Sequence, residues 1–164
     1  MDRFERFEHF SLVIAEIMRL WHKLTTAEME KYGLKGPHSV YLLVLGRHPE
    51  GLTATQMCEL CAKDKADVSR MISIMEKKGL VYRSNQKSGV YRGVFCLTEE
   101  GKTVAKEVRE RSGIAVLMAG RDMTDVQRAS MYEALDSITA NLRQLSEDGL
   151  PDKLPATERK EAEE

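Results

Sequence analysis

The chain has 164 residues, a formal net charge of −1 and a hydrophobic fraction of 42%, which is enough apolar material for one domain with helical extensions. It contains no run of about 18 apolar residues, and its first residues lack the basic start and apolar core of a signal peptide, so we expect no membrane span and a cytoplasmic location. Its three cysteines, an odd number, argue against a disulfide framework.

Positive charge gathers in one segment of the chain. Residues 63–92 hold eight Lys and Arg against three Asp and Glu, which leaves +5 there and −6 on the rest of the chain. A basic segment on an acidic body suits a protein that presents one face to phosphates. A solvated, lysine-rich surface would give the same count, so charge alone leaves both interpretations open.

Residues 1–34 predict a long N-terminal helix that serves dimerisation. It carries an apolar heptad stripe with spacings of 3-4-3-4-3, made of Phe7, Phe10, Ile14, Ile17, Trp21 and Leu24. Other apolar residues widen this surface, so we expect the helix to be covered on more than one side. It should run to about Tyr32 and end at Gly33.

Residues 35–98 predict three short helices and a hairpin. The first helix starts at Pro37 and is mostly buried through Val40 and residues 42–45. Thr53 and Gln56 form a capping-box pattern that opens the second helix.

The third helix of this region has a weaker start signal and a clear stop. Asp64, with Asp67 three residues on, can cap its beginning, and Gly79 is the expected stop after Lys78. Residues 80–83 and 91–97 then read as two strands around a turn.

Residues 99–148 predict C-terminal dimerisation helices. Thr98 caps the first of them, Gly120 interrupts it, and Thr124 with Gln127 opens the last. The last helix carries apolar residues at spacings of 4-3-4-3, namely Met131, Leu135, Ile138, Leu142 and Leu145. The two terminal helices can form a shared core between two chains or pack onto each other within one chain, and we predict the homodimer. Residues 149–164 predict a disordered acidic tail.

The helix that begins near Asp64 is the candidate for contact with DNA. Its apolar residues, Val68, Met71, Ile72 and Met75, would face the core and leave a polar side for the major groove. The alternative is an ordinary helix with an exposed polar face. The DNA-contacting residues that we predict are Lys63, Lys65, Ala66, Asp67, Ser69, Arg70, Ser73 and Lys77, with Lys87, Ser88 and Arg92 from the wing.

These motifs resemble the MarR family of bacterial transcription regulators. The family pattern joins an Asp-Lys-Ser-Thr-Val-Thr-Arg-like helix start, a Leu-Glu-Lys-Lys-Gly-Leu-like helix end and a Leu-Thr-Glu-Glu-Gly turn after the wing. Its counterparts in this chain are Asp64-Lys65-Ala66-Asp67-Val68-Ser69-Arg70, Met75-Glu76-Lys77-Lys78-Gly79-Leu80 and Leu97-Thr98-Glu99-Glu100-Gly101. The resemblance extends over nearly the whole chain, because the flanking heptad helices match the family's dimerisation helices.

The wing departs from the family pattern. The family carries an Asp-x-Arg or Asp-Arg-Arg element several residues before the Leu-Thr. This chain has Ser88-Gly89-Val90-Tyr91-Arg92-Gly93 there, with no aspartate and with Arg92 closer to Leu97 in sequence than the family's arginine.

The resemblance implies a mainly α fold with a small β-hairpin wing, that is, a winged helix-turn-helix with N- and C-terminal dimerisation helices. It implies a homodimer on a palindromic DNA operator, a role most often as repressor, no cofactor, and release by a small aromatic or anionic effector. The residues that could line an effector cleft are Met18, Trp21, His22, His38 and Tyr41, for which core packing is the alternative.

Cys58 and Cys61 form a Cys-x-x-Cys, but no second ligand pair lies at a zinc-finger distance. We therefore expect them to be structural, and keep as the alternative a thiol-based redox sensor or a winged helix that binds protein. No His-Glu-x-x-His, Ser-His-Asp set or Gly-rich phosphate loop occurs, so we expect a protein that is not an enzyme.

Overall fold

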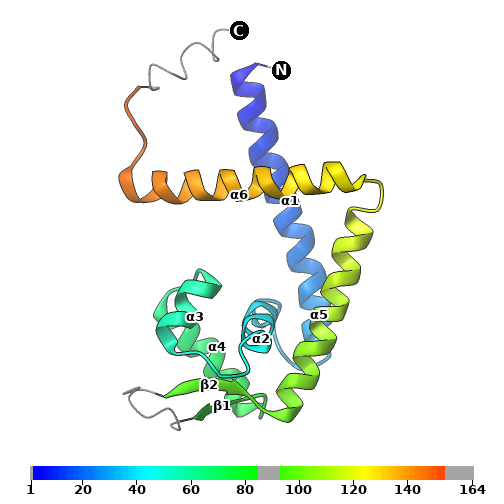
Figure 1. Cartoon of the computed structure of the whole chain (residues 1–164), viewed down its shortest axis with the longest axis vertical. Coiled ribbons are helices and arrows are strands. Elements are labelled where there is room, and N and C mark those ends of the chain that lie inside the picture. The colour runs from blue at the N-terminus through cyan, green and yellow to red at the C-terminus, as the bar shows by residue number, and fades with distance from the viewer. Residues whose placement is uncertain (1, 85–92, 154–164) are drawn as a thin grey trace. The chain divides into compact units, whose positions relative to one another are not determined.

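The computed structural model describes residues 2–84 and 93–153 (Figure 1). The elements in chain order are α1 (Arg3–Glu30), α2 (His38–Gly46), α3 (Ala54–Cys61), α4 (Lys65–Lys77), β1 (Val81–Ser84), β2 (Val94–Leu97), α5 (Glu99–Ala119) and α6 (Asp125–Asp148). This confirms the predicted class, mainly α with a small β-hairpin. The predicted wing turn at 85–92 and most of the predicted acidic tail, 154–164, lie outside the described residues.

The chain divides into two compact units, Ser11–Val116 and Met1–Phe10 with Leu117–Glu164. The buried hydrophobic residues of the described structure all lie in the first unit, between Met29 and Val108. No described helix is both long enough and apolar enough to cross a membrane.

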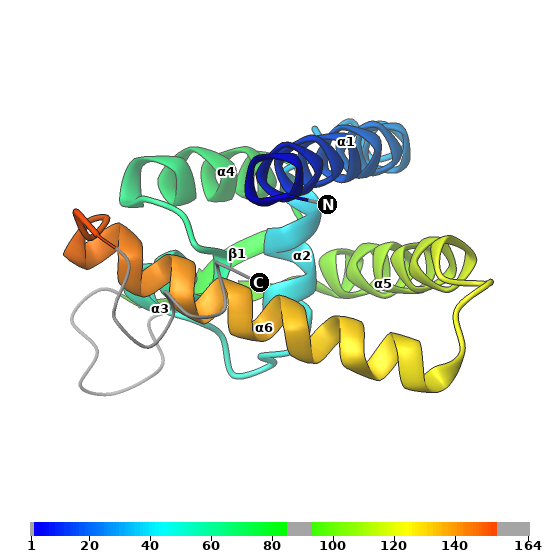
Figure 2. The same cartoon turned by 90° about the horizontal axis from the view of Figure 1, so that it is seen from above.

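Helix α2 lies at the centre of the first unit. It packs against α3, α4 and β2, and both views place it between the α3–α4 pair on one side and α5 on the other (Figures 1 and 2). Tyr41, Leu42 and Leu45 form its buried face. Val40 was expected to be buried but is 41% exposed, because the helical period places it opposite that face.

The helix-turn-helix is capped as its sequence indicates. The Thr53 hydroxyl accepts from the Gln56 backbone N–H and the Gln56 side chain accepts from the Thr53 N–H, so the predicted capping box is confirmed. Asp64 accepts the backbone N–H of Asp67 at 2.8 Å and starts α4. Gly79, at φ +72°, ends that helix in the left-handed conformation that favours glycine.

The hairpin is short and its inner strand is fully buried. β1 pairs antiparallel with β2, with Val81 opposite Leu97 and Ser84 opposite Val94. The backbones of Leu52 and Phe95 exchange two further hydrogen bonds, at 2.8 and 3.1 Å, which attach the loop before α3 to β2. The hairpin is thus anchored to the loop before α3 as well as to itself.

Thr98 and Gly101 join the hairpin to α5. The Thr98 hydroxyl donates to the Gly79 carbonyl at 2.7 Å and accepts the Gly101 N–H at 3.0 Å. A Cβ at Gly101 would overlap the carbonyl oxygen of Leu80, so only glycine permits this close approach of α5 to the start of the hairpin.

The second unit contains α6, which opens at the predicted capping box of Thr124 and Gln127. No residue of this helix is buried in the described structure. Of its apolar stripe, Leu135, Ile138 and Leu142 are exposed, and Met131 and Leu145 are half-buried.

Gly101→Ala should lower the free energy of unfolding by about 1–3 kcal/mol, because the added methyl forces backbone apart where α5 meets the hairpin. The matched control is Gly113→Ala in the same helix, where an added Cβ meets nothing within 4 Å and should stabilise by about 0.5–1 kcal/mol. Urea unfolding of both variants measures the difference. Equal effects at the two positions would contradict the close approach at Gly101.

Candidate DNA interface

Helix α4 has a buried apolar side and an exposed polar side. Val68, Ile72 and Met75 are buried, and Met71 is half-buried against the same core. Of the predicted contact residues, Lys65, Ala66, Ser69, Arg70 and Lys77 are exposed, whereas Asp67 and Ser73 are half-buried. The described members of the set therefore share the outward side of one helix, which we call the α4 outer surface.

Lys63 lies just before this helix in the turn from α3. Ala62 adopts φ +50° there, and the Lys63 N–H bonds to the carbonyl of Cys58 at 3.0 Å. The turn leaves the Lys63 side chain exposed beside the start of α4, where a cation can meet a phosphate. Lys87, Ser88 and Arg92, the predicted wing contacts, lie outside the described residues.

A buried tyrosine of α2 forms a hydrogen bond with a residue of α4. Tyr41 of α2 is 1% exposed, and its hydroxyl donates to Oδ2 of Asp67 at 3.1 Å. The other oxygen of Asp67, Oδ1, accepts from Nη2 of Arg70 at 3.3 Å. One carboxylate thus joins the core of the unit to an exposed guanidinium.

The environment of Asp67 favours its charged form. Partial burial raises the pKa of this carboxyl. The hydrogen bonds from Tyr41 and Arg70 together lower it by more than burial raises it, so the pKa of Asp67 lies below its ordinary value. Burial and the hydrogen bond to Asp67 both raise the pKa of Tyr41, so its hydroxyl stays protonated and remains a donor.

Two residues near this surface were not singled out by the sequence pattern. Ile74 is an exposed apolar residue of α4, of the kind that can contact a thymine methyl group. The guanidinium of Arg83 in β1 lies 4.9 Å from the ring centre of Phe95, a cation–π contact that holds it at the base of the wing. Whether each side chain is exposed depends on which face of its helix or strand is buried. A strand of four residues is too short for the sequence pattern to show its buried face.

The predicted effector residues separate into three environments. Trp21 lines a cleft of about 30 Å³ within the first unit, together with residues that include Ser39, Glu28 and Arg111. Met18 and His22 are exposed. His38 and Tyr41 are each 1% exposed in the core and do not line this cleft.

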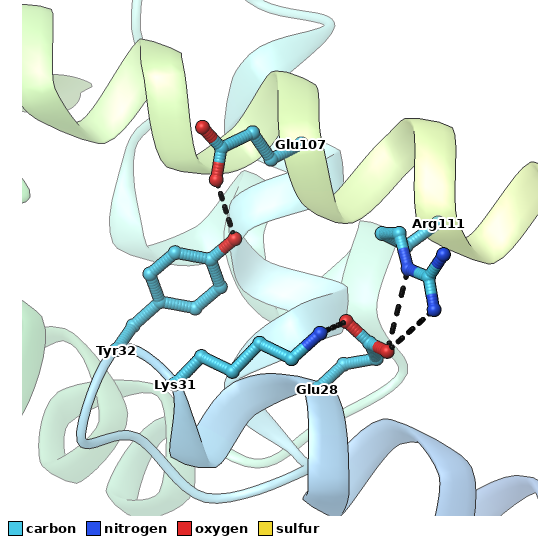
Figure 3. A network of polar contacts seen from close by, with 5 residues as sticks. All are labelled: Glu28, Lys31, Tyr32, Glu107 and Arg111. Atoms are coloured by element: carbon cyan, nitrogen blue, oxygen red, sulfur yellow. Dashed lines mark hydrogen bonds and ion pairs between the residues drawn. The ribbon is translucent and has the colours of Figure 1, made fainter.

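A polar network borders the same cleft (Figure 3). Glu28 of α1 accepts from Lys31 at 2.6 Å and from Nη2 of Arg111 at 3.1 Å, and these two contacts lower the pKa of its carboxyl. Tyr32 donates to Glu107 at 2.7 Å, which raises the pKa of Tyr32 to about 12. The network ties the end of α1 to the middle of α5.

The cysteines lie in or near the core. Cys61 and Cys96 are buried and Cys58 is half-buried. Burial raises the pKa of the Cys61 thiol to about 11, which disfavours its thiolate form. Among the described residues no three His, Cys, Asp or Glu side chains group as metal ligands.

Positive charge is not confined to the α4 outer surface. A second hollow of about 150 Å³, between α2 and α5, is lined by Arg47, Lys102, Lys106 and Arg109, and no acidic residue is among the described residues that line it. Charge alone therefore does not single out the α4 outer surface.

Comparison with known proteins gives a consistent family. Residues 32–89 match the model of the MarR family. A search of curated proteins found no match to this sequence.

Solved structures share the fold at low sequence identity. A putative MarR family transcriptional regulator from Listeria monocytogenes, complexed with 26mer DNA, is 18% identical, with 86% of this chain and 95% of that chain covered and a TM-score of 0.74. The transcriptional regulator SlyA is 21% identical, with 82% and 94% covered and a TM-score of 0.75. CouR from Rhodococcus jostii RHA1, bound to p-coumaroyl-CoA, is 17% identical, with 79% and 90% covered and a TM-score of 0.67.

Proposed function

Because the winged-helix segment of this chain is a MarR-family module, we propose that the protein is a transcription regulator that binds double-stranded DNA through α4 and its wing. The observation that carries the proposal is the α4 outer surface. A capped helix with its apolar side buried presents a basic, polar side that is free to enter a major groove. The similar fold of a relative complexed with DNA supports the same role.

The two kinds of contact divide among the residues of this surface. Arg70, with a side chain that is 66% exposed, can pair with guanine, whereas Lys63, Lys65 and Lys77 can meet phosphates. Ser69 and Ser73 can bond to either. Phosphate contacts supply most of the affinity and base contacts supply the sequence preference.

We propose that the protein works as a homodimer. Each unit leaves large apolar side chains exposed: Ile17, Met18 and Leu24 on α1 in the first, and Leu135, Ile138 and Leu142 on α6 in the second. Exposed apolar surface of this extent marks an interaction site. Two copies would present two α4 helices to a palindromic operator with half-sites about 34 Å apart.

We propose further that a small aromatic or anionic effector regulates binding and that the protein represses its target genes. CouR is bound to p-coumaroyl-CoA, an aromatic ligand with anionic groups. Trp21 and Arg111 offer an aromatic face and a cation at one cleft. A cleft of about 30 Å³ holds roughly one water, so a ring can enter only when a lining side chain moves.

DNA binding should weaken steeply with salt. With a duplex enriched from random DNA, Lys65→Ala should reduce the slope of log affinity against log salt by about 1, because one phosphate contact is lost. Arg70→Ala should lower the preference for the enriched duplex over a mismatched one by about tenfold, because a base contact is worth roughly 1–3 kcal/mol. Fluorescence anisotropy measures both. Arg143→Ala, in the other unit, is the control and should change neither; salt-independent binding would reject the proposal.

Light scattering should give twice the chain mass of 18.6 kDa at micromolar concentration. Leu142→Glu should give a monomer, because the leucine is 53% exposed in one chain and the dimer would have to bury the new charge. Ala140→Glu, on the opposite side of α6, should remain dimeric. A wild-type mass of one chain would contradict the dimer.

Benzoate should quench or shift the fluorescence of Trp21, the only tryptophan, by entering its cleft. The carboxylate would compete with Glu28 for Arg111, so Arg111→Ala should weaken the response severalfold, as expected for a charge-assisted contact. Arg109→Ala removes a neighbouring cation that does not line this cleft and should leave the response intact. The effector site is excluded if saturating benzoate leaves the spectrum unchanged or if both variants respond alike.

A further inference from the structure

We infer that Asp67 is a positioning residue, which the Tyr41 hydroxyl holds in place and which in turn fixes the guanidinium of Arg70 for reading a base. This inference rests on the proposed DNA-binding function and adds a device that sets its sequence preference. A carboxylate on a surface proposed to contact phosphates lowers the affinity for DNA by charge repulsion. The presence of Asp67 there therefore needs an explanation.

The first step is the anchor. Tyr41 is buried among the residues that pack α2 onto α4, and a buried tyrosine has little freedom to rotate. Its hydroxyl bonds to Oδ2 of Asp67 from the core side of α4. The Asp67 side chain is 20% exposed, so the surrounding protein as well as the tyrosine limits its movement.

The second step is the hold on Arg70. Asp67 and Arg70 are three residues apart, so their side chains lie on neighbouring positions of the helix surface. Oδ1 accepts from Nη2 of Arg70, and the remaining donors of the guanidinium stay available for a base. An arginine that is 66% exposed would otherwise sample many rotamers, and holding it in one reduces the entropy lost on binding DNA.

An ordinary helix-start role does not account for this geometry. In a capping box, the Glu or Gln side chain at the third position of the helix bonds back to the backbone N–H of the N-cap residue. Thr53–Gln56 and Thr124–Gln127 make that return bond with their amides. Asp67 gives its backbone N–H to Asp64, but its two oxygens bond to Tyr41 and Arg70.

The charge and the positioning role predict opposite effects on two measurable quantities. Removing the negative charge should raise affinity for any duplex, because repulsion of phosphates falls. Releasing Arg70 should lower the preference for the base that it reads. A residue that only stabilised the helix would move affinity for every sequence in the same direction.

The test compares Asp67→Asn with Asp64→Asn. Both remove one carboxylate from the start of α4, but the Asp64 side chain accepts the backbone N–H of Asp67, whereas the Asp67 side chain bonds to Tyr41 and Arg70. Asparagine caps a helix as well as aspartate does. Binding to an enriched duplex, its single-base variants and a random duplex is measured at one salt concentration. Asp67→Asn should lose about tenfold in base preference and gain affinity for random DNA. Asp64→Asn should gain affinity for random DNA alone.

Two further variants locate the effect. Tyr41→Phe keeps the carboxylate, so it should lower base preference without raising affinity for random DNA. In an Arg70→Ala background, Asp67→Asn should cost no further preference, because both changes remove the same contact. Unchanged preference in Asp67→Asn, or an equal loss in Asp64→Asn, would overturn the positioning role.

A DNA-free readout separates this inference from the proposed function. Carbon-detected NMR titration of full-length protein should show the pKa of the Asp67 carboxyl rising in Tyr41→Phe and in Arg70→Ala. If wild-type protein fails to bind DNA, the proposed function is rejected and the reading role with it, whatever the titration shows. If wild-type binds DNA but the pKa stays fixed in both variants, the positioning contact is rejected and the function stands.

Discussion

The packing of α4 onto α2 is the contact on which the other features of the first unit depend. Val68, Ile72 and Met75 bury one side of α4, and burying an apolar side chain of this size is worth about 1.5–3 kcal/mol. That burial decides which residues of the helix face outward. The polar side becomes available for DNA because the apolar side is occupied, so the stability of the fold and the orientation of the proposed contact residues have the same origin.

Helices α1 and α6, unlike α4, leave large apolar side chains exposed. α6 buries no residue in the described structure, and α1 exposes several large apolar side chains. Isolated helices gain little from propensity alone and need an amphipathic face to be covered. In the proposed homodimer, a second copy of the chain would cover the apolar faces of both helices. The core of the first unit accounts for the fold of the winged helix, but it does not account for the apolar stripe of α6, which the proposed dimer would cover.

Features that depend on neighbours in sequence could be predicted, and features that depend on tertiary packing could not. Both capping boxes join residues three positions apart, so the sequence pattern alone was enough to predict them. Val40 was placed in the core because its neighbours are apolar, although its position on the helix turns it outward. The Tyr41–Asp67 bond joins residues 26 positions apart on two helices, and the sequence gives no local sign of it.

Asp67 shows how a family pattern and an individual chain can differ in mechanism. The family pattern carries threonine where this chain has Asp67, and threonine can accept a hydrogen bond but cannot form an ion pair with Arg70. A carboxylate at this position repels phosphates and so lowers the affinity for any DNA. It is useful only if the gain in sequence specificity outweighs this loss of affinity. The Asp67–Arg70 pair should contribute little to folding, because its arginine is 66% exposed and water screens the attraction. Its proposed value therefore lies in the orientation of the guanidinium, with the carboxylate held in turn by the buried hydroxyl of Tyr41.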